Sequence, residues 1–152
     1  MIEIRRAERS DLPAIIALLA DDVLGASRET IGDPPADGYL IAFREIENDP
    51  NQFLALMVDG DDVVGTLQLS FIRGLAREGA KRGLIEAVRI ASGRRGERLG
   101  EQLIEWAIAE CRRRGCFLVQ LTSDRARLDA HRFYERLGFE PTHIGYKLKL
   151  SE

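Results

Sequence analysis

The stretch Ser92-Gly93-Arg94-Arg95-Gly96-Glu97-Arg98-Leu99-Gly100 joins an apolar, strand-like run at residues 84–91 to a segment with helical periodicity. Its glycines allow the backbone to approach a ligand closely. The free amides of a first helical turn carry the positive end of the helix dipole, which favours an anion such as a pyrophosphate. The stretch predicts either an anion-binding turn between a strand and a helix or a plain structural turn.

Two well-known nucleotide motifs do not fit this turn. The P-loop order G-x-x-x-x-G-K-[ST] is missing, and the turn lies too late in the chain for the usual dinucleotide fingerprint. Basic residues nevertheless gather here: four arginines at positions 89, 94, 95 and 98 stand against a single acid, Glu97. A small polyanion would bind to a patch of this size.

Downstream of the turn, the pattern predicts a helix, a strand, a second helix and a last strand. Arg112, Arg113 and Arg114 complement the negative end of the first helix dipole, and Gly115 is a natural C-terminal cap. The expected strands are residues 116–122 and 145–150, with Ser123 or Asp124 capping the helix between them. The apolar faces of the two helices are Leu99, Leu103, Ile104, Ala107, Ile108 and Cys111, and Ala130, Phe133, Tyr134 and Leu137.

Upstream of the turn, a strand and two helices precede consecutive strands. Ser10 or Asp11 would cap the first helix, and Val23 lies on its apolar face. The stretch Asp59-Gly60-Asp61-Asp62 is a strong hairpin signal between two β-rich runs. The expected elements are a strand at 2–7, a helix at 12–23, a loop at 25–38, a helix at 39–47, and strands at 53–58, 63–72 and 84–91.

This order of elements predicts a mixed α/β (α+β) fold in a single domain over residues 1–152. Strands two to four follow one another without intervening helices, so we expect them to pair antiparallel. A doubly wound parallel sheet is therefore disfavoured. A chain of 152 residues is long enough for two or three packed layers without a metal or a disulfide.

Composition excludes several partners. The net charge of −3 argues against a general nucleic-acid binder, and no apolar run is long enough to cross a membrane. The two cysteines form no C-x-x-C pattern and the start lacks an apolar signal core, so we expect a reducing, cytoplasmic setting. The acids Asp21, Asp22, Asp33 and Asp37 fit a solvated acidic surface better than a site that attracts a cationic amine.

Two segments resemble the GNAT superfamily of N-acetyltransferases. Residues 95–100, Arg-Gly-Glu-Arg-Leu-Gly, are similar to its R/Q-x-x-G-x-G/A motif, except that Arg98 stands where the motif has its middle glycine. Residues 130–139, Ala-His-Arg-Phe-Tyr-Glu-Arg-Leu-Gly-Phe, resemble its A-x-x-F-Y-x-x-L-G-F segment. The two segments occur in the family's order, separated by a helix and a strand, so together they are far more specific than either alone.

The resemblance implies a GNAT-like three-layer fold with a mostly antiparallel mixed sheet of six to seven strands, about four flanking helices, and splayed fourth and fifth strands. It implies acetyl-CoA as cosubstrate and no metal. The pantetheine arm would pair with backbone groups of Val88, Arg89 and Ile90, much as an added strand pairs with a free edge. The backbone amides expected to bind the pyrophosphate are those of Arg95, Gly96, Glu97, Arg98, Leu99 and Gly100.

Glu86 interrupts an otherwise apolar strand and, by strand alternation, should share a face with Val88. A carboxylate there either forms a structural ion pair or is poorly solvated and accepts a proton readily, which suits a general base. An amine must lose a proton before it attacks a thioester carbonyl. The family's strand-four acid therefore makes Glu86 the candidate for this step, directly or through a water molecule.

Tyr134 lies on the core-facing side of the last predicted helix, where a buried tyrosine usually has a hydrogen-bonded hydroxyl and no further role. In the resembling family a tyrosine here stands near the CoA sulfur and can protonate the leaving thiolate. Tyr134 is therefore the second candidate catalytic residue. His131 and Arg127 lie at earlier positions of the same helix, where either can contact CoA or remain on the exposed surface.

These observations predict an N-acetyltransferase that moves an acetyl group from acetyl-CoA to a primary amine of a small molecule or peptide by direct attack in a ternary complex. Two alternatives remain open. One is a non-catalytic acyl-CoA-binding regulatory module of the same fold, and the other is an unrelated nucleotide-binding α/β domain. The resemblance also implies that a homodimer can form through the C-terminal strand, whereas the amine acceptor is not identified by the sequence.

Overall fold

The computed structural model of the chain describes residues 1–151. Within them, a single sheet has the strand order β1-β2-β3-β4-β5, and every neighbouring pair is antiparallel except β4 and β5, which are parallel. The expected antiparallel pairing of the consecutive strands is confirmed. The strands are β1 (Ile2–Arg6), β2 (Gln52–Asp59), β3 (Asp62–Arg73), β4 (Lys81–Ile90) and β5 (Leu118–Leu121).

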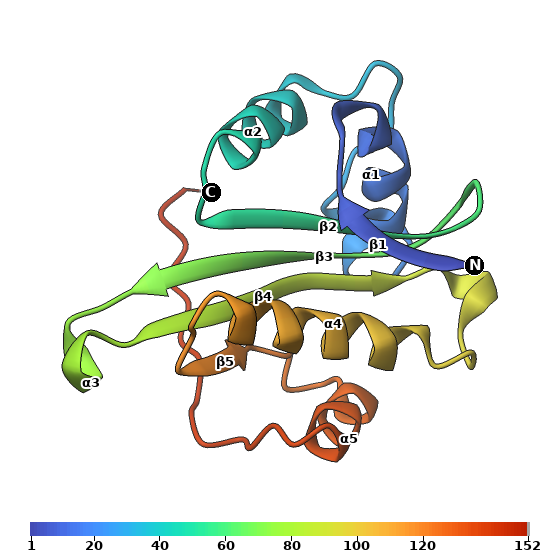
Figure 1. The fold of residues 1–152 in the computed structure, drawn as a ribbon. Coiled ribbons are helices and arrows are strands. Elements are labelled where there is room, and N and C mark those ends of the chain that lie inside the picture. The colour runs from blue at the N-terminus through green and yellow to red at the C-terminus, as the bar shows by residue number, and fades with distance from the viewer. Residues whose placement is uncertain (152) are drawn as a thin grey trace.

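Helices cover both faces of this sheet. Figure 1 shows α1 and α2 on one side and α4 and α5 on the other, which makes the three layers of the expected mixed α/β fold. Every helix within residues 1–151 is too short or too polar to span a membrane. The helices are α1 (Leu12–Ala20), α2 (Asp37–Glu47), the single turn α3 (Ala76–Gly79), α4 (Leu99–Arg113) and α5 (Leu128–Arg136).

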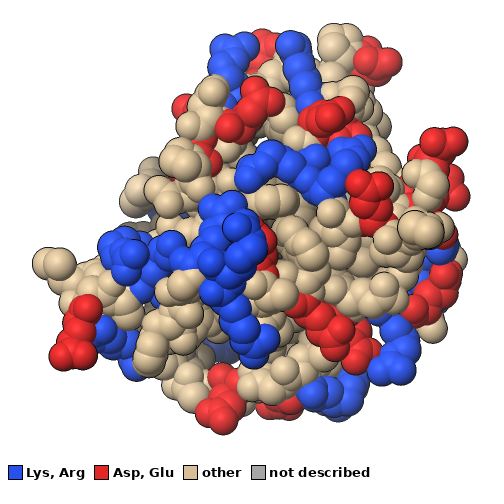
Figure 2. All heavy atoms as spheres, in the orientation of Figure 1, with Lys and Arg blue, Asp and Glu red and all other residues tan. Residues whose placement is uncertain are grey.

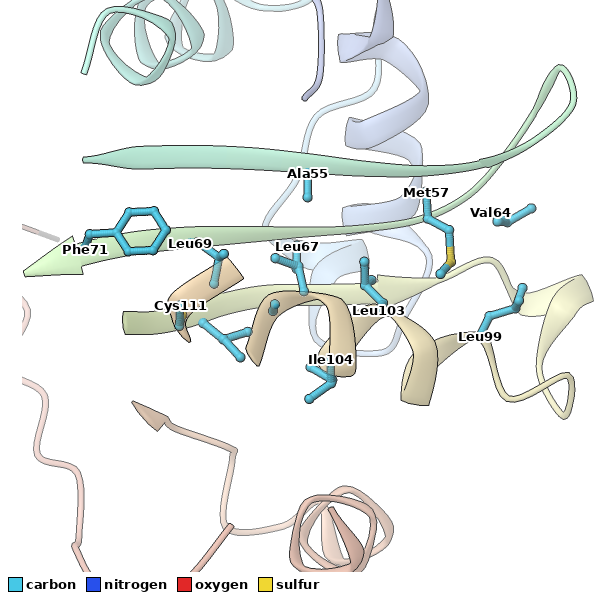
Figure 3. Close-up of a cluster of buried hydrophobic side chains, with 12 residues drawn as sticks. Ala55, Met57, Val64, Leu67, Leu69, Phe71, Leu99, Leu103, Ile104 and Cys111 are labelled. Atoms are coloured by element: carbon cyan, nitrogen blue, oxygen red, sulfur yellow. The ribbon is translucent and has the colours of Figure 1, made fainter. Parts of the chain in front are cut away.

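The larger part of the core lies between the sheet and α4 (Figure 3). Leu103, Ile104 and Ala107 have no exposed surface, because the helical period puts them on one stripe facing the sheet. Burying one such leucine or isoleucine contributes about 1.5–3 kcal/mol. The strand residues that meet this stripe are Ala55, Met57, Val64, Leu67, Leu69, Phe71 and Ile85.

A second apolar cluster lies on the opposite face, between the sheet and the helices α1 and α2. Ile15, Ile16 and Phe43 pack there against Leu56 and Val58 of β2. Successive side chains of β2 therefore enter different clusters, as strand alternation requires. Because the sheet is covered on both faces, β2 is apolar at six consecutive positions, from Phe53 to Val58.

Two expected boundaries are wrong. Helix α1 ends at Ala20, so Val23 lies beyond it and is 93% exposed. Helix α5 begins at Leu128 with Arg127 at its N-cap, so neither Ser123 nor Asp124 caps it. The Asp124 carboxylate instead accepts a hydrogen bond from the Ala126 amide at 2.9 Å and stabilises the turn before the helix.

The last expected strand is also wrong. Residues 145–150 belong to neither a helix nor a strand, and Tyr146, Leu148 and Leu150 are exposed. Alternating apolar residues form a strand only where a neighbouring edge supplies hydrogen bonds. Residues 1–151 therefore contain five strands in the sheet rather than the expected six to seven.

The close contact between β4 and α4 generates a stability prediction. A methyl group added at Gly83 would overlap the buried Sγ of Cys111. We expect Gly83→Ala to lower the free energy of unfolding by about 1–3 kcal/mol through overpacking, measured by urea denaturation. Because Cys111→Ala removes the overlapping sulfur, the double variant should lose less stability than the sum of the two single variants. Strictly additive losses would show that this contact does not limit the site.

Candidate active site

The candidate site begins where β4 and β5 separate. Their pairing extends only from Arg82 opposite Leu118 to Ile85 opposite Leu121, whereas β4 continues to Ile90. The second half of β4 therefore presents an edge that β5 does not cover, which is the expected splay. A cavity of about 100 Å³ lies at this edge, and Glu86, Val88, Arg89, Arg127 and Tyr134 are among the residues that line it.

A β-bulge at Ala87 shapes the free part of β4. Gln68 pairs with Glu86 and Thr66 pairs with Arg89, so Ala87 and Val88 together oppose Leu67. Ala87 has a φ of 53°, which belongs to the left-handed region. Such a bulge bends the strand and changes the direction of its side chains.

The bulge corrects one expectation about faces. Because Glu86 and Arg89 pair with residues two positions apart on β3, they lie on the same face of the sheet. Val88 instead packs with Ile85 and Ile90 against the core under α4. The expectation that Glu86 shares a face with Val88 is wrong, because the extra residue interrupts the alternation.

Glu86 lies in the cavity with its side chain open to solvent. It is exposed, and among residues 1–151 it has neither an ion-pair partner nor a hydrogen-bonded side chain. The structural ion pair considered from the sequence is therefore not present. A carboxylate that is free of cations and reaches a cavity can accept a proton from a ligand bound there.

Tyr134 reaches the same cavity from α5. Its ring packs edge-to-face on Phe133 and Phe139, with centroids 5.2 and 5.8 Å apart. No residue in the described range 1–151 hydrogen-bonds its hydroxyl, so the purely structural hydrogen bond expected of a buried tyrosine is missing. Burial raises the pKa of Tyr134, an effect that the charges of Arg127 and Arg89 partly offset, so the phenol stays protonated at neutral pH.

Three charged residues from distant segments meet beside the cavity. Asp22 follows α1, and its Oδ2 lies 3.1 Å from both Arg89 Nε and Arg127 Nη2, while its Oδ1 accepts the Gly25 amide. Burial acts against ionisation of Asp22, but the Gly25 hydrogen bond and the nearby arginines lower the pKa of this carboxyl overall. Asp22 therefore remains ionised and joins three parts of the chain.

Sequence reasoning did not identify Asp22 as a site residue. Its side chain is only 11% exposed, so the expectation of a solvated acidic surface is wrong for this residue. The two arginines that hold it come from β4 and from the start of α5, which is 105 positions further along the chain. No local pattern of residues indicates such a long-range pairing.

The two candidate residues at the start of α5 differ in position. Arg127 lines the cavity, and its side chain is 42% exposed. His131 instead lies 2.8 Å from the backbone oxygen of Asp124 through its Nε2 and is absent from the cavity wall. His131 thus holds the loop before α5, whereas Arg127 can contact a ligand.

Two residues of the loop before α4 have a positive φ, a backbone conformation that favours glycine. Gly96 has a φ of 89° and Arg98 a φ of 60°, so Arg98 adopts a left-handed conformation at the position where the motif has a glycine. No side chain within residues 1–151 caps this helix. The amides of Leu99, Gly100 and Glu101 lie in its first turn, where they have no intrahelical partner and can donate to an anion.

The expected cluster of positive charge is mostly neutralised. Arg94 binds Asp59 and Glu97, both at 2.8 Å, and Arg98 binds Glu101 at 2.9 Å. Arg95 is exposed and forms no ion pair with any residue from 1 to 151. Figure 2 likewise shows basic and acidic side chains next to one another at several places on the visible face. Arg95 is therefore the loop arginine best able to bind an external anion.

The structure also describes the surroundings of Val88 and Gly100, two residues whose backbone groups were expected to bind acetyl-CoA. The Val88 carbonyl accepts a hydrogen bond from Arg89 Nη1 at 2.9 Å, so one group of the free edge is already engaged. A methyl group added at Gly100 would touch the Phe133 ring at 3.5 Å, which is ordinary van der Waals contact. Gly100 therefore packs under α5 as well as belonging to the first turn of α4. Within the described chain, no cluster of three potential metal ligands occurs.

This arrangement agrees with the family to which the sequence belongs. Residues 15–139 match the Acetyltransferase (GNAT) family, and the chain is a member of it. The match includes the loop before α4, the splayed strands and the α5 segment. The resemblance of the two short motifs is therefore confirmed at the level of the whole domain family.

Individual relatives cover nearly the full chain. A solved structure described as a transcriptional regulator from Bacillus halodurans C-125 is 44% identical, with a TM-score of 0.96, covering 99% of this chain and 100% of that one. The aminoalkylphosphonate N-acetyltransferase of Salmonella typhimurium is 29% identical over 95% of this chain and 88% of its own. Glucosamine-6-phosphate N-acetyltransferase from Arabidopsis thaliana shares the fold, with a TM-score of 0.81 at 22% identity and 99% coverage of both chains.

The left-handed Arg98 generates a prediction about stability. We expect Arg98→Gly to raise Tm by about 2–4 °C, because glycine adopts this conformation without the steric cost that a Cβ imposes. Arg98→Ala is the control, since it also removes the Glu101 ion pair but keeps the Cβ. The measurement is thermal unfolding followed by circular dichroism. A rise in Tm for the alanine variant as large as that for glycine would contradict this explanation.

Proposed function

We propose that residues 1–152 form a single N-acetyltransferase domain that acts in the cytoplasm. It would transfer the acetyl group of acetyl-CoA to a primary amine of a small molecule or peptide. One observation carries the proposal: an unpaired carboxylate, Glu86, and a hydroxyl without a partner within residues 1–151, that of Tyr134, line the same cavity where β4 leaves β5. These are the proton acceptor and the proton donor that direct acetyl transfer needs.

The surroundings of the cavity suit the two ends of acetyl-CoA. The first-turn amides of α4 and the unpaired Arg95 are donors for the pyrophosphate. The free half of β4 offers backbone groups to the two amides of the pantetheine arm, in the manner of an added strand. His131 stays a weaker candidate for CoA contact, because it holds the loop at Asp124.

The chemistry balances without a further reactant. The bound ammonium gives one proton to Glu86, directly or through water, and the neutral amine attacks the thioester carbonyl. Backbone amides of β4 stabilise the developing oxyanion. A C–N bond forms, the C–S bond breaks, and the CoA thiolate takes a proton from Tyr134. The excess proton on the amide nitrogen passes to the Tyr134 phenolate and restores it, and Glu86 releases its proton to solvent, so one proton is released overall. Holding both substrates side by side supplies much of the acceleration, because the attack becomes effectively unimolecular.

A second function has a specific observation in its favour. The relative that is 44% identical is described as a transcriptional regulator, which fits a module that binds acyl-CoA without catalysis. The Salmonella relative is named as an N-acetyltransferase and favours catalysis on a small amine. The residues of the cavity favour the enzyme, because Glu86 and Tyr134 put a proton acceptor and a protonated phenol on the wall of one cavity.

Catalysis is tested by measuring thiol release from acetyl-CoA with a panel of amines. We expect Glu86→Gln to lower kcat/KM by about 100-fold and Tyr134→Phe by about 10-fold or more, in the range typical of lost acid–base assistance. Glu45→Gln and Tyr146→Phe are matched controls on exposed surface outside the cavity and should keep full activity. Unchanged rates in both cavity variants would refute these roles, and CoA binding without turnover on any amine would favour the regulatory module.

Cosubstrate identity is tested by thermal shift with CoA, ATP and NAD. At 100 times its dissociation constant, CoA should stabilise the protein by about 2.7 kcal/mol, a rise in Tm of roughly 5–10 °C. Arg95→Gln should weaken CoA binding, because it removes an unpaired cation from the loop, whereas Arg77→Gln at the β3–β4 turn should not. Stabilisation by ATP or NAD with CoA inert would support the unrelated nucleotide-binding domain instead.

A further inference from the structure

The guanidinium of Arg89 has donors that the described protein does not satisfy. The Arg89 side chain is only 15% exposed, and its Nη1 donates to the Val88 carbonyl. Its Nε is buried and, although 3.1 Å from Asp22, makes no hydrogen bond of acceptable geometry within residues 1–151. Burial lowers the pKa of Arg89, which shows how poorly its charge is solvated. The Asp22 carboxylate stabilises this charge on the buried Nε side, and Nη2, which has no acceptor within residues 1–151, is the donor that a ligand in the cavity can use.

Asp22 does not engage every donor of the nearby arginines. One carboxylate serves two guanidinium groups and the Gly25 amide at once. Arg28 adds a third positive charge close enough to affect both Asp22 and Arg89, while Glu29 offsets it in part and accepts the Tyr39 hydroxyl at 2.9 Å. Arg89 Nη2 and Arg127 Nη1 have no hydrogen-bond acceptor within residues 1–151, and both side chains line the cavity, so these donors are available to an acceptor-rich anion there.

The register of β4 places these donors near the candidate general base. Glu86 and Arg89 pair with positions two apart on β3, which corresponds to about 7 Å along a strand. Both line the same cavity, and Arg127 lines it from the start of α5. Asp124 also lines it, but its carboxylate is engaged by the Ala126 amide. A ligand with an amine at Glu86 would therefore present its other end to the two arginines.

We propose that the acceptor is a small zwitterion, an amine that carries a carboxylate or phosphonate a few bonds away, and that Arg89 and Arg127 bind this anionic group. This inference rests on the proposed acetyltransferase function and adds a substrate class to it. The two arginines are specificity-determining residues: they hold the acceptor so that its amine lies beside Glu86. The anion satisfies the donors that Asp22 leaves free.

The experiment compares acceptors that differ only in the anionic group. β-Alanine and 2-aminoethylphosphonate supply the two anions, and β-alaninamide and propylamine are their uncharged counterparts. We expect kcat/KM to be about 10- to 100-fold higher for the anionic acceptors, as charge-assisted hydrogen bonds allow. The ratio between the carboxylate and the phosphonate then identifies which anion the site prefers. Equal use of charged and uncharged acceptors would overturn the proposal.

Arg127→Gln tests the subsite directly, because this exposed position tolerates change better than the buried Arg89. It should lower kcat/KM at least tenfold for the anionic acceptors, through KM, and less than threefold for β-alaninamide. Arg127→Lys should restore part of the loss. Arg125→Gln removes the same charge from the same loop outside the cavity and should leave the preference unchanged. A rise in KM for acetyl-CoA alone would assign Arg127 to CoA and overturn the inference.

A second experiment separates failure of this inference from failure of the proposed acetyltransferase function. If no amine is acetylated, calorimetric titration of the CoA-saturated protein with β-alanine, 2-aminoethylphosphonate and β-alaninamide decides the question. Binding of the anionic ligands, lost in Arg127→Gln and absent for the amide, would support the subsite in a non-catalytic protein. Absence of binding by either anionic ligand would refute it.

Discussion

The separation of β4 from β5 is the feature on which the candidate site depends. β4 is held on one side by β3 along nearly its whole length, and α4 packs over it through a fully buried stripe. Its other side loses β5 after Ile85, so one strand has both a rigid anchor and a free edge. The bulge at Ala87 then puts Arg89 on the same face as Glu86, the face covered by α1. A site built this way is precise because its support lies in the core rather than in a loop.

Local patterns were enough to predict most of the fold. The hairpin at Asp59 to Asp62, the helical stripe of α4 and the turn before it depend on neighbours close in sequence, and each is present in the structure. The bulge at Ala87 was not predictable, because alanine carries no signal for a left-handed residue. The pairing of Asp22 with Arg89 and Arg127 and the missing last strand depend on distant partners, which periodicity does not reveal. Glu86 and Tyr134, the two candidate catalytic residues, line one cavity, whereas the expected shared face of Glu86 and Val88 is wrong.

The same geometry bears on the contrast between an enzyme and a regulator. Both need the turn before α4 and the free edge of β4 if they bind an acyl-CoA. Direct acetyl transfer additionally needs a proton acceptor and a proton donor, which the solvent-open Glu86 and the protonated Tyr134 would supply under the proposed function. A structure described as a transcriptional regulator shares 44% identity and the overall fold with this chain, so the overall fold alone does not separate the two functions.

The ion cluster around Asp22 has a thermodynamic consequence. Asp22 holds the segment after α1 through Gly25 and simultaneously ties β4 to the start of α5. An anion that draws either arginine away from Asp22 weakens these ion pairs. The affinity for the anion and the order of the segment after α1 therefore depend on each other. Linkage acts equally in both directions. A substitution in the Gly25 turn that never touches a ligand would therefore change how tightly the cavity binds one.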